Sequence, residues 1–242
     1  MLLPFPLPPG WPFSPRAPLG ELSVLNSCEL PSLGGGWTVR ATEPLVGHGG
    51  AEPLAGAFGR GGLVLAGEHV LRPYRRGGAV RHINRGIYLS PRRFRDEYNV
   101  HSAIWAAGFP TVEPVGYAHR RRLWGFEGVF ITRKAQGVPW PRVWGQTGGD
   151  AFAAQAADLI KWLSAWGLWA PDLNATNFLL TPDRKMIALD WDKAGWTHSP
   201  RLLEGYLERL ERSMRKLEAP LALLEELRMH TLGEIWTMAN QD

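Results

Sequence analysis

The sequence predicts an α+β chain in two lobes: a small antiparallel sheet with one helix, followed by a mostly helical part. Three observations lead to this prediction. Short apolar runs between glycine- and proline-rich turns occupy most of residues 36–135, with one helical segment at 91–107. Helical periodicity dominates 150–167 and 201–240. Between these helices, two short apolar runs around a Pro-Asp turn predict a β-hairpin over 178–189.

The composition limits the class of protein. The chain has 242 residues, of which 45% are hydrophobic and 21% charged, as in globular proteins with an ample core. Its single cysteine, Cys28, forms no internal disulfide and no cysteine metal cluster, which favours a reducing compartment. No run of eighteen apolar residues predicts a membrane span. The proline-rich N-terminus is a poor signal peptide, because no basic residue precedes its apolar part.

The first half of the chain predicts an arm and a glycine-rich hairpin. Residues 1–35 lack sustained periodicity and predict an extended arm that packs on the surface or stays mobile, and 36–46 predict a first strand. In the following segment, Gly56, Gly59 and Gly61 would let backbone N–H groups approach phosphates. No P-loop signature is present, and a flexible hairpin explains these glycines equally well.

Two charged residues follow on predicted regular elements. Arg72 lies on a predicted strand at 68–74, where its guanidinium could bind phosphate as a fork. The helix at 91–107 begins at Pro91 and carries Glu97 beside its apolar face. Glu97 is the candidate partner of Arg72. The alternatives are a surface arginine and a glutamate paired on its own helix.

The second half begins with two further predicted strands, the later one at 128–133, and with a hinge ending near residue 139. The C-terminal helical segment is interrupted near Pro220. The predicted division is therefore an arm at 1–35, an N-terminal lobe at 36–135 and a helical C-terminal lobe at 136–242.

Three polar residues frame the predicted hairpin. Asp172 and Asn177 precede its first strand, and Asp190 ends its second, so folding the hairpin brings them toward one edge. One carboxylate can accept the proton of an attacking hydroxyl, while the amide and the second carboxylate supply oxygen ligands for Mg²⁺ on ATP phosphates. The alternative is an Asp/Asn-rich turn beside an ordinary core hairpin.

Basic residues are concentrated in two places. Eight arginines and no acidic residue occur between Arg72 and Arg95, and a second cluster occupies 119–122. Such a surface predicts an anionic partner such as phosphate, an acidic sugar, anionic lipid or nucleic acid, although a solvated basic face is the alternative. No recognised motif favours nucleic acid.

The order of these features resembles the lipopolysaccharide-core sugar kinases, the family of 3-deoxy-D-manno-octulosonic acid (Kdo) kinases. The most specific pieces are R-P-Y-R-R-G-G from Arg72 and D-L-N-A from Asp172, followed by L-D-W-D around Asp190. The resemblance covers roughly residues 50–200.

The resemblance implies a protein-kinase-like fold that phosphorylates a sugar hydroxyl of Kdo–lipid A with ATP and Mg²⁺, peripherally at the cytoplasmic face of the inner membrane. By position, Asp172 would be the base, Asn177 and Asp190 would hold metal, and Arg72 with Glu97 would hold phosphate. Kdo carries a carboxylate and lipid A carries phosphates, which suits the arginine-dense stretch.

Two features depart from the family pattern. Ala170 stands two residues before Asp172, where kinases place a supporting histidine, and the glycine-rich segment is not G-x-G-x-x-G. Two alternatives therefore stay open. One is a kinase with a soluble small-molecule or protein acceptor, and the other is a non-catalytic module that binds an anionic lipid or partner.

Overall fold

The computed structural model describes residues 6–45, 52–54, 62–75, 86–146 and 149–239. The chain divides into two compact units. Unit 1 comprises Pro15–Ala135, and unit 2 comprises Gln136–Asp242 together with Leu2–Ser14.

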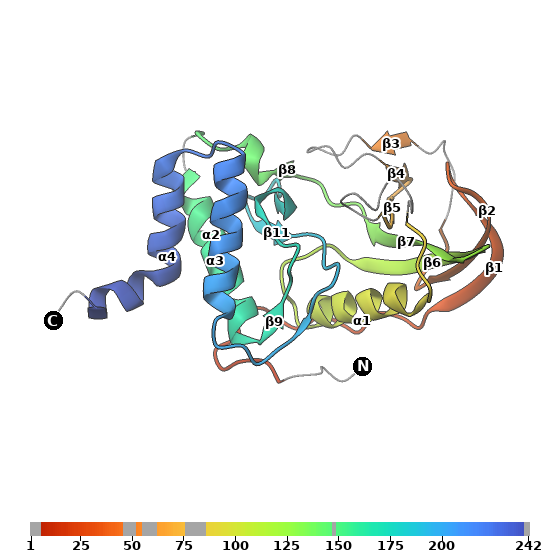
Figure 1. Cartoon of the computed structure of the whole chain (residues 1–242), viewed down its shortest axis with the longest axis horizontal. Helices are drawn as coiled ribbons and strands as arrows, with labels where there is room; N and C mark the ends of the chain where they lie inside the picture. The colour runs from red at the N-terminus through yellow and green to blue at the C-terminus, as the bar shows by residue number, and fades with distance from the viewer. Residues whose placement is uncertain (1–5, 46–51, 55–61, 76–85, 147–148, 240–242) are drawn as a thin grey trace. The chain divides into compact units, whose positions relative to one another are not determined.

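Seven strands form an antiparallel sheet in the described part of unit 1, in the spatial order β1-β2-β6-β7-β5-β4-β3 (Figure 1). They are β1 (Ser23–Leu30), β2 (Gly34–Ala41), β3 (Glu52–Leu54), β4 (Leu63–Ala66), β5 (His69–Pro73), β6 (Pro114–Arg122) and β7 (Gly125–Arg133). The long hairpin β6–β7 lies in the centre of the sheet and pairs with β5 on one side and β2 on the other. Arg72 on β5 therefore faces Phe130 on β7 in the ladder.

Helix α1 (Arg92–Ala106) packs against β6 and β7. It begins after Pro91, as predicted, and its fully buried Phe94 joins an aromatic cluster with Tyr74, Tyr117 and Phe130. The helix approaches the sheet closely at Gly128, where a Cβ atom would lie 2.3 Å from the Phe94 ring. A second cluster of buried apolar side chains, including Trp37, completes the core of the sheet.

The first strand differs from the sequence expectation. The predicted extended arm at 1–35 includes β1, so the strand predicted at 36–46 is the second in the chain. β1 lacks the alternation that reveals a half-buried strand, because most of its side chains are exposed. Its pairing with β2 is also irregular, with register shifts on both sides of Cys28.

Unit 2 is mostly helical. Its helices α2 (Gly149–Ala165), α3 (Leu202–Lys216) and α4 (Leu221–Ala239) pack against one another (Figure 1). Glu211 on α3 accepts two bonds from Arg228 on α4, each 2.8 Å long. The two C-terminal helices separate at Pro220, as predicted.

Short strands carry the chain between α2 and α3. β10 (Phe178–Leu180) pairs with β11 (Met186–Ala188), which confirms the predicted hairpin, and β8 (Val138–Pro139) extends this small sheet. β9 (Leu168–Trp169) pairs with β12 (Gly195–Trp196). These strands hold the loop that contains Asp172.

These elements confirm the predicted α+β fold: an antiparallel sheet with one helix, followed by a helical part. In the part of the chain that the structure describes, no helix is both long enough and apolar enough to cross a membrane.

Candidate functional site

The loop between β9 and β10 is held in a fixed shape by its own polar side chains. Asn174 caps the short helix η3 (Ala175–Asn177), because its Oδ1 accepts a bond from the Thr176 amide at 3.0 Å. The Asn174 Nδ2 group also donates to the Asp172 carbonyl at 2.9 Å. The backbone of Asp172 is thereby tied to the following turn.

Asn177 joins the loop to the hairpin. It is 94% buried, and its Nδ2 group donates to the Asp172 carbonyl at 2.7 Å. Its own carbonyl accepts the amide of Leu189, the residue before Asp190, at 2.7 Å. Two bonds of one residue therefore bring Asp172 and Asp190 to the same edge of the hairpin.

Lys193 completes the link from the other end. Its Nζ donates to Asp172 Oδ2 at 3.0 Å, while the lysine side chain remains about half exposed. Between Asp190 and Lys193, the fully buried Trp191 anchors the segment in the core. The candidate base thus contacts a cation that follows the candidate metal ligand by three residues.

Asp190 and Lys193 both have left-handed backbones, with φ of +66° and +60°. Few non-glycine residues adopt this conformation, and those that do often belong to functional sites. The Asp190 carboxylate also accepts a long bond, 3.4 Å, from the Asp192 amide.

The side-chain oxygens of Asn177 and Asp190 are of the kind that magnesium binds. Nδ2 of Asn177 is used by the Asp172 carbonyl, and no donor among the described residues contacts the Asn177 amide oxygen. Carboxylate and amide oxygens suit Mg²⁺, which takes few protein ligands and completes its shell with phosphates and water. Within the described ranges, no group of three or more His, Cys, Asp or Glu side chains could hold a metal ion.

The loop has a support where the sequence lacks the kinase histidine. Ala170 is fully buried, and its amide donates to the hydroxyl of Tyr206 on α3 at 2.8 Å. The same hydroxyl donates to the Leu168 carbonyl at 2.7 Å. Burial raises the pKa of Tyr206, so its hydroxyl stays protonated as a donor at physiological pH.

A second α3 residue holds the far end of the loop. The Ser213 hydroxyl accepts the Ala175 amide at 2.9 Å and donates to the Leu210 carbonyl at 2.8 Å. Helix α3 therefore fixes the backbone both before and after Asp172.

Replacing Tyr206 with phenylalanine should lower the free energy of unfolding by about 1–3 kcal/mol, because the Ala170 amide and Leu168 carbonyl would lose a buried partner. Urea unfolding measures this loss. An unchanged free energy of unfolding would show that the two backbone groups find other partners.

Within unit 1, Arg72 and Glu97 form the pair predicted from the sequence. The Arg72 guanidinium contacts the Glu97 carboxylate, whose side chain is 2% exposed. Tyr74 donates its hydroxyl to the second oxygen of this carboxylate at 2.6 Å. The Arg72 side chain keeps 26% exposure, so the pair is buried on the acid side and accessible on the guanidinium side.

The glycines predicted to lie near phosphates, Gly56, Gly59 and Gly61, are outside the described residues. The neighbouring Gly62 is described and has φ of +110°, a conformation that side-chain-bearing residues rarely adopt.

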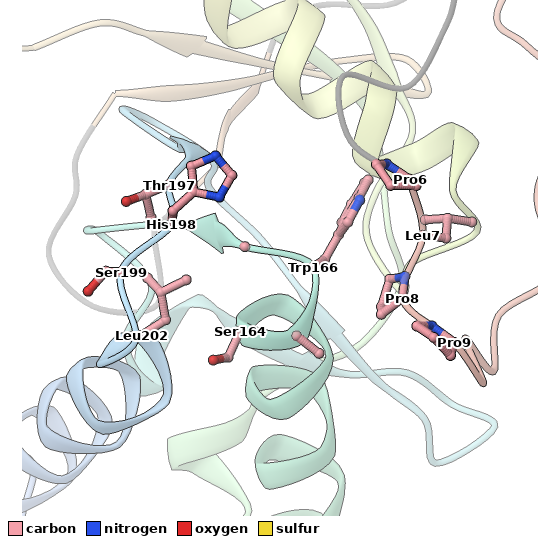
Figure 2. A pocket seen from close by; sticks show the side chains of 12 residues that line it. Pro6, Leu7, Pro8, Pro9, Ser164, Trp166, Thr197, His198, Ser199 and Leu202 are labelled. Atoms are coloured by element: carbon pink, nitrogen blue, oxygen red, sulfur yellow. The ribbon is translucent and has the colours of Figure 1, made fainter.

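A groove in unit 2 lies apart from these residues. Pro6, Leu7, Pro8 and Pro9 form one side, and the C-terminal end of α2 with Thr197–Ser199 forms the other (Figure 2). The arm reaches α2 through Trp11, whose ring meets those of Trp162 and Trp166 at 5.7 and 5.3 Å. None of the predicted site residues lines this groove.

Sequence reasoning missed Lys193, Tyr206 and Ser213. Lys193 directly follows the D-W-D run, and this proximity was a usable signal. Tyr206 and Ser213 act from α3 across 36 and 38 residues, and no local pattern distinguishes them from other helix positions.

The family model described as lipopolysaccharide kinase (Kdo/WaaP) family matches residues 56–230. A solved structure of a divergent Toxoplasma kinase, described as lacking the glycine-rich loop and regulating membrane ultrastructure of the parasitophorous vacuole, is 16% identical. That match covers 67% of each chain with a TM-score of 0.37. No curated protein matches the chain.

Proposed function

Because the chain belongs to the lipopolysaccharide kinase (Kdo/WaaP) family, we propose that it transfers the γ-phosphoryl group of ATP to a sugar hydroxyl of a lipopolysaccharide inner-core glycolipid, of the Kdo–lipid A type. Membership of a kinase family supports phosphoryl transfer as the reaction. The observation that carries the chemistry is the hydrogen-bonded edge of unit 2 that joins Asp172, Asn177 and the residues around Asp190.

Asp172 acts as the base in this proposal. Its carboxylate accepts the proton of the sugar hydroxyl as that oxygen bonds to the γ-phosphorus, and the bond from this phosphorus to the bridging oxygen breaks to release ADP. The Lys193 ammonium, 3.0 Å from the Asp172 carboxylate, holds this side chain in place.

Asn177 and Asp190 hold magnesium in this proposal through the amide oxygen of one and the carboxylate of the other. Magnesium would neutralise charge on the ATP phosphates. The left-handed backbone of Asp190 and the buried anchor of Trp191 orient the carboxylate before any ligand arrives.

Arg72 binds the α- and β-phosphates in this proposal, and the Glu97 carboxylate fixes the guanidinium. Tyr74 reinforces this arrangement from the other carboxylate oxygen. Backbone N–H groups around Gly56, Gly59 and Gly61 would add donors to the same phosphates.

The acceptor determines where the protein works. Lipid A lies in the membrane, and ATP is cytoplasmic, so the proposed reaction takes place peripherally at the cytoplasmic face of the inner membrane, as one step of lipopolysaccharide biosynthesis. The arginines between Arg72 and Arg95 favour this anionic acceptor over a neutral one.

The test is incubation of the purified chain with ATP, Mg²⁺ and Kdo–lipid A, followed by mass spectrometry. The proposal requires a glycolipid heavier by one phosphate and no product without ATP. A parallel panel of soluble sugars and proteins tests the identity of the acceptor independently of the reaction. Phosphorylation of a soluble acceptor but not of the glycolipid would support kinase activity and contradict the glycolipid as its acceptor.

A further inference from the structure

The turn between β6 and β7 exposes two large apolar side chains. Arg122 pairs with Gly125, so Leu123 and Trp124 alone form the turn, and they are 84% and 78% exposed. Two-residue hairpin turns favour small polar residues such as Asn-Gly. Leu123 and Trp124 are therefore unusual residues for this turn, and both keep apolar surface exposed to water, which is unfavourable in free energy.

Leu89 joins them from another part of the chain. An isolated bridge pairs Tyr88 with Phe126 through bonds of 2.8 and 2.7 Å, two residues beyond Trp124. Leu89 follows Tyr88 directly and is 89% exposed. The backbones meet closely here, because a Cβ on Gly125 would lie 2.3 Å from the Tyr88 carbonyl. Three exposed apolar side chains thus lie at one end of unit 1.

Arginines surround this apolar group. Arg121 and Arg122 lead into the turn, and three more follow Leu89 at the start of α1, namely Arg92, Arg93 and Arg95. The preceding Arg120 packs on the sheet instead, because its guanidinium lies 4.4 Å from the Trp37 ring and donates to the Leu33 carbonyl. The guanidinium of Arg93 lies 5.0 Å from the Tyr88 ring, which places the start of α1 beside the bridge. The first turn of α1 contains no acidic residue, and the helix dipole adds positive potential there.

Few carboxylates neutralise this charge. Glu127 binds Arg120 and Arg122 at 2.6 and 3.1 Å, and Asp96 lies 3.6 Å from Arg95. Among the described residues, no carboxylate contacts Arg121 or Arg92. Around the apolar group, Arg92 and Arg121 therefore add positive charge for which the described residues offer no acidic partner, although a helix start normally favours acidic side chains.

We propose that Leu89, Leu123 and Trp124, together with five arginines around them (Arg92, Arg93, Arg95, Arg121 and Arg122), form a surface that docks on an anionic lipid bilayer. In the docked state the three apolar side chains enter the interface between head groups and acyl chains, where tryptophan is favoured. The arginines bind lipid phosphates around the inserted turn. We call these eight residues the hairpin-tip surface.

A bilayer fits this surface better than a protein or a nucleic acid does. A stable protein interface needs about 800 Å² on each partner, whereas a two-residue turn with one neighbouring leucine is narrow. A nucleic acid would use the arginines and the tryptophan but would leave Leu89 and Leu123 in water. Docking serves the proposed function, because a lipid-linked acceptor stays in its bilayer.

The test is sedimentation of the full chain with vesicles, without nucleotide or glycolipid. We expect binding to vesicles made of equal amounts of phosphatidylcholine and phosphatidylglycerol, and no binding to vesicles of phosphatidylcholine alone. The double variant Leu123→Ser/Trp124→Ser should reduce partitioning by about ten- to hundredfold, since each side chain loses its burial in the interface. Arg121→Glu should reduce it by about tenfold.

Matched controls lie in unit 2. Leu221→Ser/Met229→Ser removes two exposed apolar side chains from α4, which are 71% and 58% exposed, and Arg212→Glu reverses an exposed charge on α3. Both should bind vesicles as the wild type does. Thermal unfolding followed by circular dichroism should be unchanged in the tip variants, because the altered side chains lie in water.

Equal binding by the tip variants and the wild type would overturn the inference, as would a wild type that ignores anionic vesicles. Tip variants that lose binding to RNA or an acidic protein but keep vesicle binding would assign the surface to that partner instead. Kinase activity on detergent-dispersed glycolipid is measured separately. If the tip variants lose vesicle binding but keep this activity, the proposed function stands. If the wild type binds vesicles through the tip but has no kinase activity, the docking surface stands and the proposed function fails.

Discussion

Replacing Asp172 with asparagine is expected to lower kcat by about 10²–10⁴-fold and to leave the affinity for ATP unchanged. The amide preserves the size of the side chain and can still accept a bond from Lys193, which lies 3.0 Å from the carboxylate. It cannot take up the proton of the attacking hydroxyl. Steady-state kinetics with the glycolipid and calorimetric titration with ATP measure the two quantities.

Asp183→Asn is the matched control for this variant. Asp183 lies on the turn of the same hairpin, its side chain is 59% exposed, and Lys185 contacts it at 3.1 Å. The control should keep the wild-type rate, because this turn has no proposed role in transfer. A wild-type rate in Asp172→Asn would contradict the assignment of the base.

Replacing Arg72 with methionine is expected to lower the free energy of unfolding by about 3–5 kcal/mol and to weaken ATP binding. The loss of stability follows from Glu97, whose buried carboxylate would keep its bond from Tyr74 but lose its contact with the Arg72 guanidinium. The loss of affinity follows from the proposed contact of the guanidinium with phosphate. Urea unfolding and ATP titration report them separately.

A second substitution separates the two effects. In Arg72→Met/Glu97→Gln the buried group is neutral, so most of the lost stability should return while ATP binding stays weak. Arg133→Met serves as the control. Arg133 pairs with Glu43 and Glu113 at the surface, so its removal should cost no more than about 1 kcal/mol and leave ATP binding unchanged. Wild-type ATP affinity in the double variant would restrict Arg72 to a structural role.

The sequence predicted the parts of this protein whose signals are local. The β10–β11 hairpin follows from two apolar runs around one turn, and it fixes the spacing of Asn177 and Asp190. Helix α1 follows from Pro91 and its apolar face, which left Glu97 as a natural partner for Arg72.

The features that sequence reasoning missed depend on distant contacts or lack a pattern. β1 has mostly exposed side chains and an irregular register, so no alternation marks it as a strand. Tyr206 supports the loop at Ala170 from a helix 36 residues away. Its hydroxyl accepts the Ala170 amide and donates to the Leu168 carbonyl, and only the packing of α3 reveals that it reaches them.

The most direct test of the kinase proposal is ATP binding to the purified chain with and without Mg²⁺, for the wild type and for Asp190→Ala. The proposal predicts magnesium-dependent binding in the wild type and loss of the magnesium dependence in the variant, because the Asp190 carboxylate would hold the ion. A wild type that binds no nucleotide would contradict it. The arginines of unit 1 would then serve a non-catalytic role.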